Sequence, residues 1–382
     1  MDCQELFSVI DRMNEEYCTI WEAVCNIESP TAYKAGVDAV GDCFIKMANA
    51  RGWPVEVLAN EKAGNAICIT LNPEAKGQAV VFSGHIDTVH PVGLFGTPAV
   101  RRDETRMYGP GVMDCKGGVV ASFMAMDALE KCGFTVRPVR LIIQTDEETG
   151  SKTSDLKTVE FMCAKAKNAA AFLNTEGIQG NTAVLVRKGI LRYRFTVSGK
   201  AVHSASCDKG ANAIAEAAHK ILKLESFKDA NTLTCNCGII EGGTVANTVA
   251  EKCSFVADFR FADEADYRKA VQMAEESAEH SEIQGCSCVL EKISFRPAMP
   301  LADRNSRLLE KMNEIYGQNS LPRLTARTCL SGSDAAYITE AGIPCVDNLG
   351  VDGGNIHSVN EFAYLDSLAA SAKRLAAVAC CL

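Results

Sequence analysis

The 382-residue sequence predicts an α/β protein in which a separate α+β domain is inserted. From residue 1 to about 188, strand-like and helix-like segments alternate, as they do in a doubly wound sheet. From 189 to 295 the order becomes β-α-β-β-α-β, which is typical of a ferredoxin-like unit. The α/β pattern then resumes. We therefore expect one domain of residues 1–188 and 296–382, and an inserted domain of residues 189–295.

The elements of the first domain are predicted from apolar runs bounded by glycine and acidic residues. Short apolar runs of this kind are typical of buried strands. A glycine-dense turn over residues 108–118 leads into a longer apolar run that reads as a helix. In chain order, the expected elements are a strand at 79–82, a helix at 119–129, and strands at 139–145, 169–175 and 344–350.

The elements of the inserted domain are predicted from two kinds of periodicity. Residues 191–197 alternate apolar and polar side chains, which indicates an antiparallel strand with one exposed face. Residues 211–224 carry apolar side chains at helical spacing, which indicates an amphipathic helix. The remaining expected elements are strands at 232–240, 253–261 and 288–293 and a helix at 264–280.

A chemical signal follows the strand at 79–82, where His85 and Asp87 are separated by one residue. Residues two apart in a strand point to the same face, so these side chains should project side by side. This is the arrangement of a metal-binding histidine whose ring is oriented by a carboxylate. A His-x-Asp pair on its own is weak support for a metal site.

Four further acidic or imidazole positions occur near the ends of predicted elements. Asp114 lies where the glycine-dense turn becomes a helix, and taken alone it could be an N-cap. Asp146, Glu147 and Glu148 follow a core strand. They could form a solvated acidic loop, but adjacent carboxylates repel one another and a cation would stabilise them. The remaining positions are Glu176, after the strand at 169–175, and His357, in the loop after the strand at 344–350.

These five clusters share a predicted location at the carboxyl ends of strands. In open α/β sheets that edge is where ligands bind. Ligands limited to imidazole and carboxylate suit zinc or a similar divalent ion. The set is large enough for two ions that share one carboxylate.

The motifs resemble, in order and over nearly the whole chain, the M20 family of dinuclear zinc peptidases and deacylases. Within it, the sequence looks most like the glutamate carboxypeptidase branch, on the motifs at 108–111, 296–298 and 332–337 and on the glutamate at position 176. The resemblance implies a mixed-sheet catalytic domain with an inserted ferredoxin-like lid and dimerisation domain.

The resemblance also implies roles for the clustered residues. Asp114 would be the bridging carboxylate, followed by a cis peptide bond, and Glu147 the general base. Cys115 is a departure, because the family commonly has an acidic or polar residue there. The implied ligands are His85 and Glu176 for one zinc and Glu148 and His357 for the other, with Asp87 orienting His85.

In the inserted domain, His203 resembles a family histidine that reaches across a dimer and stabilises the oxyanion of the tetrahedral intermediate. On its residues alone, His203 could be a surface histidine at a strand end. The candidates for substrate binding are Asn247, Arg260, Arg296 and Gly332. Arginine binds carboxylates through two parallel hydrogen bonds, although either arginine could instead form a surface ion pair.

These expectations describe a metal-dependent hydrolase that cleaves the amide bond of a small peptide or N-acyl amino acid with a free carboxylate. It would be carboxypeptidase-like and would use two divalent ions, zinc or else cobalt or manganese. One alternative is an N-acyl-amino-acid deacylase of the acetylornithine deacetylase or desuccinylase type. Another is a non-catalytic metal-binding member of the fold, which the presence of Glu147 disfavours. We expect a homodimer formed through the inserted domain.

Composition narrows the partners and the compartment. The net charge of −9 disfavours a nucleic-acid partner. The sequence contains no apolar run of the ~20 residues that a membrane span requires, and its start does not resemble a secretory signal. The eighteen cysteines are scattered and are interpreted as reduced thiols of a cytoplasmic protein. The pairs Cys235/Cys237 and Cys286/Cys288 lack partner histidines, which favours half-buried strand residues over a metal site.

Overall fold

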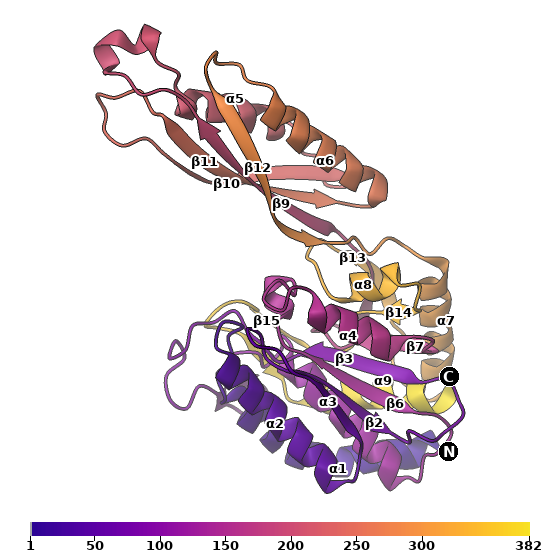
Figure 1. Ribbon diagram of the computed structural model, residues 1–382. Helices are drawn as coiled ribbons and strands as arrows, with labels where there is room; N and C mark the ends of the chain where they lie inside the picture. Colours follow the sequence, from indigo (N-terminus) through magenta and orange to yellow (C-terminus); the bar gives the residue numbers. More distant parts are fainter. Residues whose placement is uncertain (1) are drawn as a thin grey trace. The chain divides into compact units, whose positions relative to one another are not determined.

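The computed structural model describes residues 2–382 and divides into two compact units (Figure 1). The larger unit comprises the residues up to Leu185, Leu301–Thr328 and Ser333–Leu382. The smaller unit comprises Val186–Pro300 and Cys329–Gly332. Within residues 2–382, none of the helices is both long and apolar enough to cross a lipid bilayer.

The larger unit is built on a six-stranded mixed sheet in the order β1-β2-β6-β3-β7-β14. Its centre is parallel, since β3 pairs in parallel with β6 and β7, and β14 pairs in parallel with β7. Strand β2 runs antiparallel to both of its neighbours, so the sheet is mixed rather than purely doubly wound. The strands are β1 (Val55–Leu58), β2 (Ala66–Leu71), β3 (Val80–His85), β6 (Val139–Gln144), β7 (Ala171–Asn174) and β14 (Cys345–Val346).

Helix α3 (Lys116–Lys131) is the centre of the helical layer. It packs against β3 and β6 and also against the first and last helices, α1 (Cys3–Cys25) and α9 (Asp366–Cys381). Every residue of α3 from Lys116 to Leu129 is buried, which explains why its sequence is apolar on all sides rather than on one stripe. The other helices are α2 (Lys34–Ala50), α4 (Lys157–Ala166), α7 (Asp303–Gln318) and α8 (Ala335–Glu340).

Two small sheets accompany the six-stranded sheet. One is antiparallel in the order β15-β16-β5-β4, and its strands come from two distant parts of the chain. They are β4 (Arg101–Arg102), β5 (Arg106–Tyr108), β15 (Gly353–Gly354) and β16 (Phe362–Tyr364). The other joins β8 (Thr182–Arg187) to β13 (Thr325–Cys329). By pairing with β16, strand β5 links the chain before residue 114 to the chain after residue 357.

The smaller unit is a four-stranded antiparallel sheet in the order β10-β11-β9-β12, with helices α5 and α6 packed on it. Numbered within the unit, the strand order is 2-3-1-4, which is the ferredoxin-like arrangement predicted from sequence. Strand β9 alternates buried and exposed residues, as expected for a sheet covered on one face. The elements are β9 (Gly189–Ser198), α5 (Ala213–Leu224), β10 (Leu233–Gly242), β11 (Lys252–Phe261), α6 (Glu264–Glu279) and β12 (Ser287–Arg296).

The predicted elements are present, with shifts at their ends. The strand expected at 344–350 is only two residues long, Cys345–Val346, because the chain then turns and donates from Leu349 N–H to the carbonyl of Asn174. Cys235, which lies on β10, is buried, and Cys237, Cys286 and Cys288 are half-buried. Cys237 on β10 and Cys288 on β12 are therefore half-buried strand residues, as interpreted, whereas Cys235 is fully buried and Cys286 lies just before β12.

Candidate metal centre

The candidate site lies at the carboxyl edge of the larger sheet. Strands β3, β6 and β7 are parallel neighbours, so their carboxyl ends meet at one edge. The first ends at His85, the second at Gln144 and the third at Asn174. The acidic turn after β6 and Glu176 after β7 are therefore brought to the imidazole of His85 by the strand pairing itself.

Asp114 lies between the two imidazoles of the cluster. Its Oδ1 is 3.1 Å from Nε2 of His85, and its Oδ2 is 3.1 Å from Nε2 of His357. A second carboxylate lies beside each ring: Oε1 of Glu176 is 3.7 Å from Nε2 of His85, and Oε2 of Glu148 is 3.2 Å from Nε2 of His357. The structure thus brings together all five residues proposed as ligands, in two halves joined by one carboxylate.

The N-cap alternative for Asp114 is wrong. The residue at the N-cap of α3 is Cys115, and no side chain caps the first turn of the helix. The peptide bond between Asp114 and Cys115 is cis, as the family resemblance implies.

Asp87 contacts both the ring of His85 and the backbone of the acidic turn. Nδ1 of His85 is 3.0 Å from the backbone carbonyl of Asp87 and 3.4 Å from its carboxylate. The same carboxylate accepts hydrogen bonds from the backbone N–H groups of Glu147 and Glu148, each at 3.2 Å, and from the hydroxyl of Thr31 at 2.7 Å. Asp87 therefore orients the histidine ring and also fixes the turn that carries the acidic pair.

The acidic turn is not a solvated loop. Asp146 is 0% exposed and Glu147 is 8% exposed. Asp146 accepts hydrogen bonds from the hydroxyl of Thr158 at 2.7 Å and from the backbone N–H of Ser154 at 2.8 Å. Burying three consecutive acidic residues is costly unless each has hydrogen-bond donors or a cation beside it, and the contacts given above supply donors for Asp146 and a histidine for Glu148.

Burial disfavours the negative charge of the clustered carboxylates unless a positive charge lies beside them. Burial raises the pKa of Glu148 to about 8 and holds that of Glu176 well above its ordinary range. Burial also opposes ionisation of Asp114, but hydrogen bonds from His357 and His85 outweigh it and keep the pKa of Asp114 well below its usual value. One carboxylate is thus ionised because two imidazoles neutralise it.

The imidazoles show the complementary effect. Hydrogen bonds to Asp114 and Glu148 raise the pKa of His357 to about 10. Burial alone would lower the pKa of His85, but the hydrogen bonds to Asp114 and Asp87 raise it well above its ordinary value. Protonated imidazole rings therefore supply the positive charge that a bound cation would supply to these carboxylates. The donor set and its charge fit divalent metal ions.

Glu147 lies beside the cluster without forming part of the two halves. It lines a narrow space together with His85, Glu176 and Asp334. A carboxylate in this position can exchange a proton with a small molecule held against the cluster.

Cys115 is fully buried, and its Sγ lies 3.1 Å from the backbone nitrogen of His85. Its sulfur also lies within 4.8 Å of donor atoms of His85 and Glu176. Burial raises the pKa of this thiol to about 12, so the group is a protonated thiol near neutral pH.

Two buried charged residues that support the site were not singled out from the sequence. Glu361 accepts hydrogen bonds from the backbone N–H groups of Met113 at 2.9 Å and Asp114 at 3.1 Å. Lys116, which is fully buried, donates to the backbone carbonyls of Val24 and Ile27. Glu361 could have been noticed as a charged residue directly before the short strand β16. Its partners, some 250 residues away, could not.

In the smaller unit, His203 and Asn247 lie close together. His203 forms an isolated β-bridge with Thr248, and Ser204 N–H donates to the carbonyl of Asn247 at 2.9 Å. His203 is exposed, and its Nδ1 accepts a hydrogen bond from Ala205 N–H at 3.2 Å. Its Nε2 edge is therefore the part of the ring that can face a ligand.

The two candidate arginines flank one residue of β9. Arg260 of β11 and Arg296 of β12 both pair with Ile190, so their side chains emerge on the same face of the sheet. Arg260 forms an ion pair with Asp258, from Nε to Oδ1 at 2.7 Å. A Cβ atom at Gly332 would lie 2.7 Å from Cδ of Arg296, so glycine permits the close approach of this loop.

Comparisons with known proteins agree with this geometry. Carboxypeptidase G2 from Pseudomonas sp. (strain RS-16) is 27% identical over 353 residues, which cover 90% of this chain and 83% of that protein. The acetylornithine deacetylase of Myxococcus xanthus is 31% identical over 48% of this chain and 49% of that protein.

Solved structures share the fold. Aminopeptidase PepT from Bacillus cereus superposes with a TM-score of 0.79 at 22% identity, covering 96% of this chain and 98% of that one. The M20 family metallo-carboxypeptidase Sso-CP2 from Sulfolobus solfataricus gives a TM-score of 0.77 at 17% identity, covering 95% and 98%. Residues 81–380 match the sequence model of peptidase family M20/M25/M40. The chain therefore belongs to this family, and the protein is a metal-dependent peptidase or amidohydrolase.

Proposed function

We propose that the protein is a carboxypeptidase-like hydrolase that uses two zinc ions to cleave an amide bond next to a free carboxylate. The observation that carries the proposal is the arrangement around Asp114, whose two oxygens face two different imidazoles, each with its own second carboxylate. Such a shared carboxylate is what a two-ion site requires. Imidazole and carboxylate donors favour zinc, and cobalt or manganese would suit the same ligands.

In this proposal His85 and Glu176 hold one ion, His357 and Glu148 hold the other, and Asp114 is shared. When bound, the ions would polarise the scissile carbonyl and lower the pKa of a water molecule. The side chains do the rest. Glu147 accepts a proton from the attacking water and delivers it to the leaving amine. Asp87 keeps the backbone of Glu147 in place through its hydrogen bond to the N–H group.

His203 would assist by donating a hydrogen bond to the oxyanion. Arg260 and Arg296, with Asn247 and Gly332, would bind the substrate, the arginines holding its free carboxylate. The shared face of the two arginines supports this role, because their strands are separated only by β9. For Arg260, the substrate would have to compete with Asp258 for the guanidinium.

The deacylase alternative uses the same machinery on an N-acyl amino acid. It is kept because the relatives include both a carboxypeptidase and an acetylornithine deacetylase. The sequence match to the carboxypeptidase covers 90% of this chain, and the match to the deacetylase covers 48%. We favour peptide substrates because the first match is the longer one.

We further propose a homodimer formed through the smaller unit. Strand β10 is at the edge of its sheet, and Ile239 and Ile240 on it are 58% and 51% exposed. Leu222 on α5 is 73% exposed. An apolar edge strand beside an apolar helix position is a surface that a second copy would cover. His203 of the partner subunit would then serve the site of the other chain.

A cytoplasmic location completes the proposal. All eighteen cysteines, which lie within residues 2–382, are free thiols. Free thiols in this number suit a reducing compartment.

An activity panel tests the proposal. Zinc-loaded protein is assayed on peptides with C-terminal glutamate, on dipeptides, and on N-acetyl and N-succinyl amino acids. We expect the highest kcat/KM on a peptide with a free C-terminal carboxylate and a loss of activity when that carboxylate is amidated. Preference for acyl amino acids would establish the deacylase instead, and no turnover on any substrate would contradict the hydrolase assignment.

A further inference from the structure

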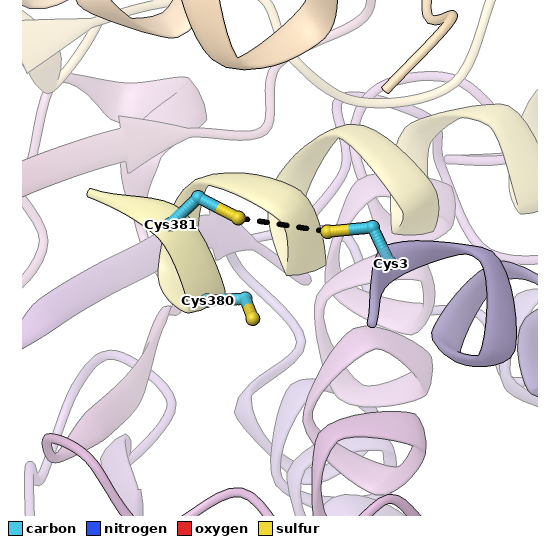
Figure 2. Close-up of side chains that lie close together, drawn as sticks. All are labelled: Cys3, Cys380 and Cys381. Carbon is cyan, nitrogen blue, oxygen red and sulfur yellow. Dashed lines mark hydrogen bonds between the residues drawn. The ribbon is translucent and has the colours of Figure 1, made fainter. Parts of the chain in front are cut away.

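A second group of metal-binding side chains lies in the larger unit and takes no part in the site described above. Cys3, Cys380 and Cys381 bring their sulfur atoms together where the start of α1 meets the end of α9 (Figure 2). The three Sγ atoms all lie within 4.8 Å of one another. We call these residues the cysteine trio.

The spacing of the trio suits a shared ion. The Sγ atoms of Cys3 and Cys381 are 3.5 Å apart. Two thiolates on one tetrahedral zinc ion lie about 3.8 Å apart, since each Zn–S bond is about 2.3 Å. A disulfide bond is much shorter, at about 2.05 Å, and would use only two of the three sulfurs.

The surrounding helices hold the sulfurs in place and leave one side open. Helices α1 and α9 pack against each other and against α3, so the two ends of the trio are fixed by the core. Cys3 is buried, Cys380 is half-buried and Cys381 is exposed. Exposure of the last thiol provides a path by which an ion could enter.

We propose that the cysteine trio is a second metal site, which binds one thiophilic ion such as Zn²⁺ or Cu⁺ through three sulfurs. Soft sulfur ligands select such ions, whereas the imidazole and carboxylate ligands around Asp114 also suit harder ions. An ion in the trio would join the first helix to the last and stabilise the folded larger unit, because the folded state alone presents the three sulfurs together.

Cadmium is a suitable probe, since its bond to a thiolate gives a charge-transfer absorption in the ultraviolet that carboxylate and imidazole ligands do not give. The full chain is reduced, stripped of metal and titrated with cadmium chloride. We expect the thiolate absorption to saturate at one ion per chain and to be competed away by zinc. The apparent thermal unfolding midpoint should rise over the same range of cadmium concentration.

Single substitutions then locate the ligands. Cys381→Ser, at the exposed position, should weaken the cadmium binding seen by this absorption by more than ~100-fold, since loss of a ligand exceeds the ~10–100-fold typical of losing a residue that only supports one. Cys3→Ser should do the same. Cys207→Ser, which removes an exposed thiol outside the trio, and Cys115→Ser and Asp114→Asn, which alter the other site, should retain the absorption.

Retention of the full absorption in both Cys381→Ser and Cys3→Ser would overturn the proposal. So would the absence of thiolate absorption in the unsubstituted chain. If mass spectrometry instead found Cys3 linked to Cys381 in protein that binds no cadmium through sulfur, the trio would be a disulfide pair and the metal site would be excluded.

Discussion

At the scale of single residues, Asp114 and Asp87 show which features the sequence predicts and which only the structure reveals. The sequence indicates both as acidic residues beside predicted elements. The structure adds that Asp114 faces His85 with one oxygen and His357 with the other. It also adds that the carboxylate of Asp87 accepts from the backbone N–H groups of the acidic turn. The family resemblance implies the first role, whereas the second depends on loop conformation.

Replacing Glu147 with glutamine tests the proposed base. Glu147→Gln keeps the size of the side chain but removes its ability to accept the proton of water. We expect kcat to fall by ~10²–10⁴-fold with metal content unchanged. Steady-state kinetics and metal analysis on the same preparation measure both effects.

Glu160→Gln, at an exposed position of α4, is the control and should leave kcat unaltered. Near-normal turnover of a metal-loaded Glu147→Gln protein would remove Glu147 from the mechanism.

Glu361 allows a test of a supporting residue. Glu361→Ala leaves the backbone N–H groups of Met113 and Asp114 without their carboxylate acceptor. Each buried group that loses its partner costs about 1–3 kcal/mol, so we expect lower stability in denaturant titrations. Because Asp114 would be less firmly placed, zinc affinity should also fall by ~10–100-fold.

The exposed Glu104→Ala provides the comparison. If Glu361→Ala lowered stability but left zinc affinity unchanged, Glu361 would have no role in placing Asp114.

At the scale of secondary-structure elements, the junction of α1, α2 and α3 depends on one buried carboxylate. Asp127 of α3 accepts hydrogen bonds from the hydroxyl of Tyr17 at 2.7 Å, from Arg51 at 2.8 Å and from Lys131 at 2.6 Å. Burial by itself raises the pKa of Asp127, but the hydrogen bonds from Arg51 and Lys131 outweigh it, and the folded-state pKa is lowered.

A lowered folded-state pKa fixes the sign of the pH dependence. The stability that Asp127 contributes is fully present above its unfolded pKa of about 3.9 and is lost as the pH falls through the lower folded value. Asp127→Asn should therefore be less stable than the unsubstituted chain at pH 7, by about 2 kcal/mol, and this difference should shrink below about pH 4. Urea unfolding of metal-free protein from pH 7 to pH 3 measures it.

The surface pair of Asp11 and Lys373 serves as the control, since exposed ion pairs contribute only about 0–1 kcal/mol. A difference between Asp127→Asn and the unsubstituted chain that stays constant with pH would contradict the role given to the carboxylate.

Elements differ in how far the sequence predicts them. The strand β9 and the helices α5 and α6 have clear periodicity and lie where the pattern places them. Helix α3 is apolar on every side, and only its length and its glycine-rich start distinguish it from a buried strand. The antiparallel position of β2 beside β6 cannot be read from local patterns, because sheet order is decided by contacts between distant segments.

At the scale of the whole molecule, the proposed dimer decides how His203 acts. If His203 of the partner subunit serves each site, mixing two inactive chains should restore activity. His203→Ala chains and Glu147→Gln chains are combined and allowed to exchange. A mixed dimer then contains one site with an intact Glu147 and an intact His203, and the rate should exceed that of either parent.

Co-purification of the second chain through an affinity tag on the first must show that mixed dimers form, and Glu147→Gln chains alone supply the background. Demonstrated mixed dimers without recovery would mean that His203 acts within its own chain or not at all.

Metal stoichiometry tests whether two ions share the site around Asp114. The measurement is made on Cys381→Ser protein, so that the cysteine trio does not add to the total. After zinc loading and removal of free metal, we expect two zinc ions per chain by elemental analysis, and a loss of bound zinc in the same protein carrying Asp114→Asn. Fewer than two ions per folded chain, or full retention of both after Asp114→Asn, would contradict the claim.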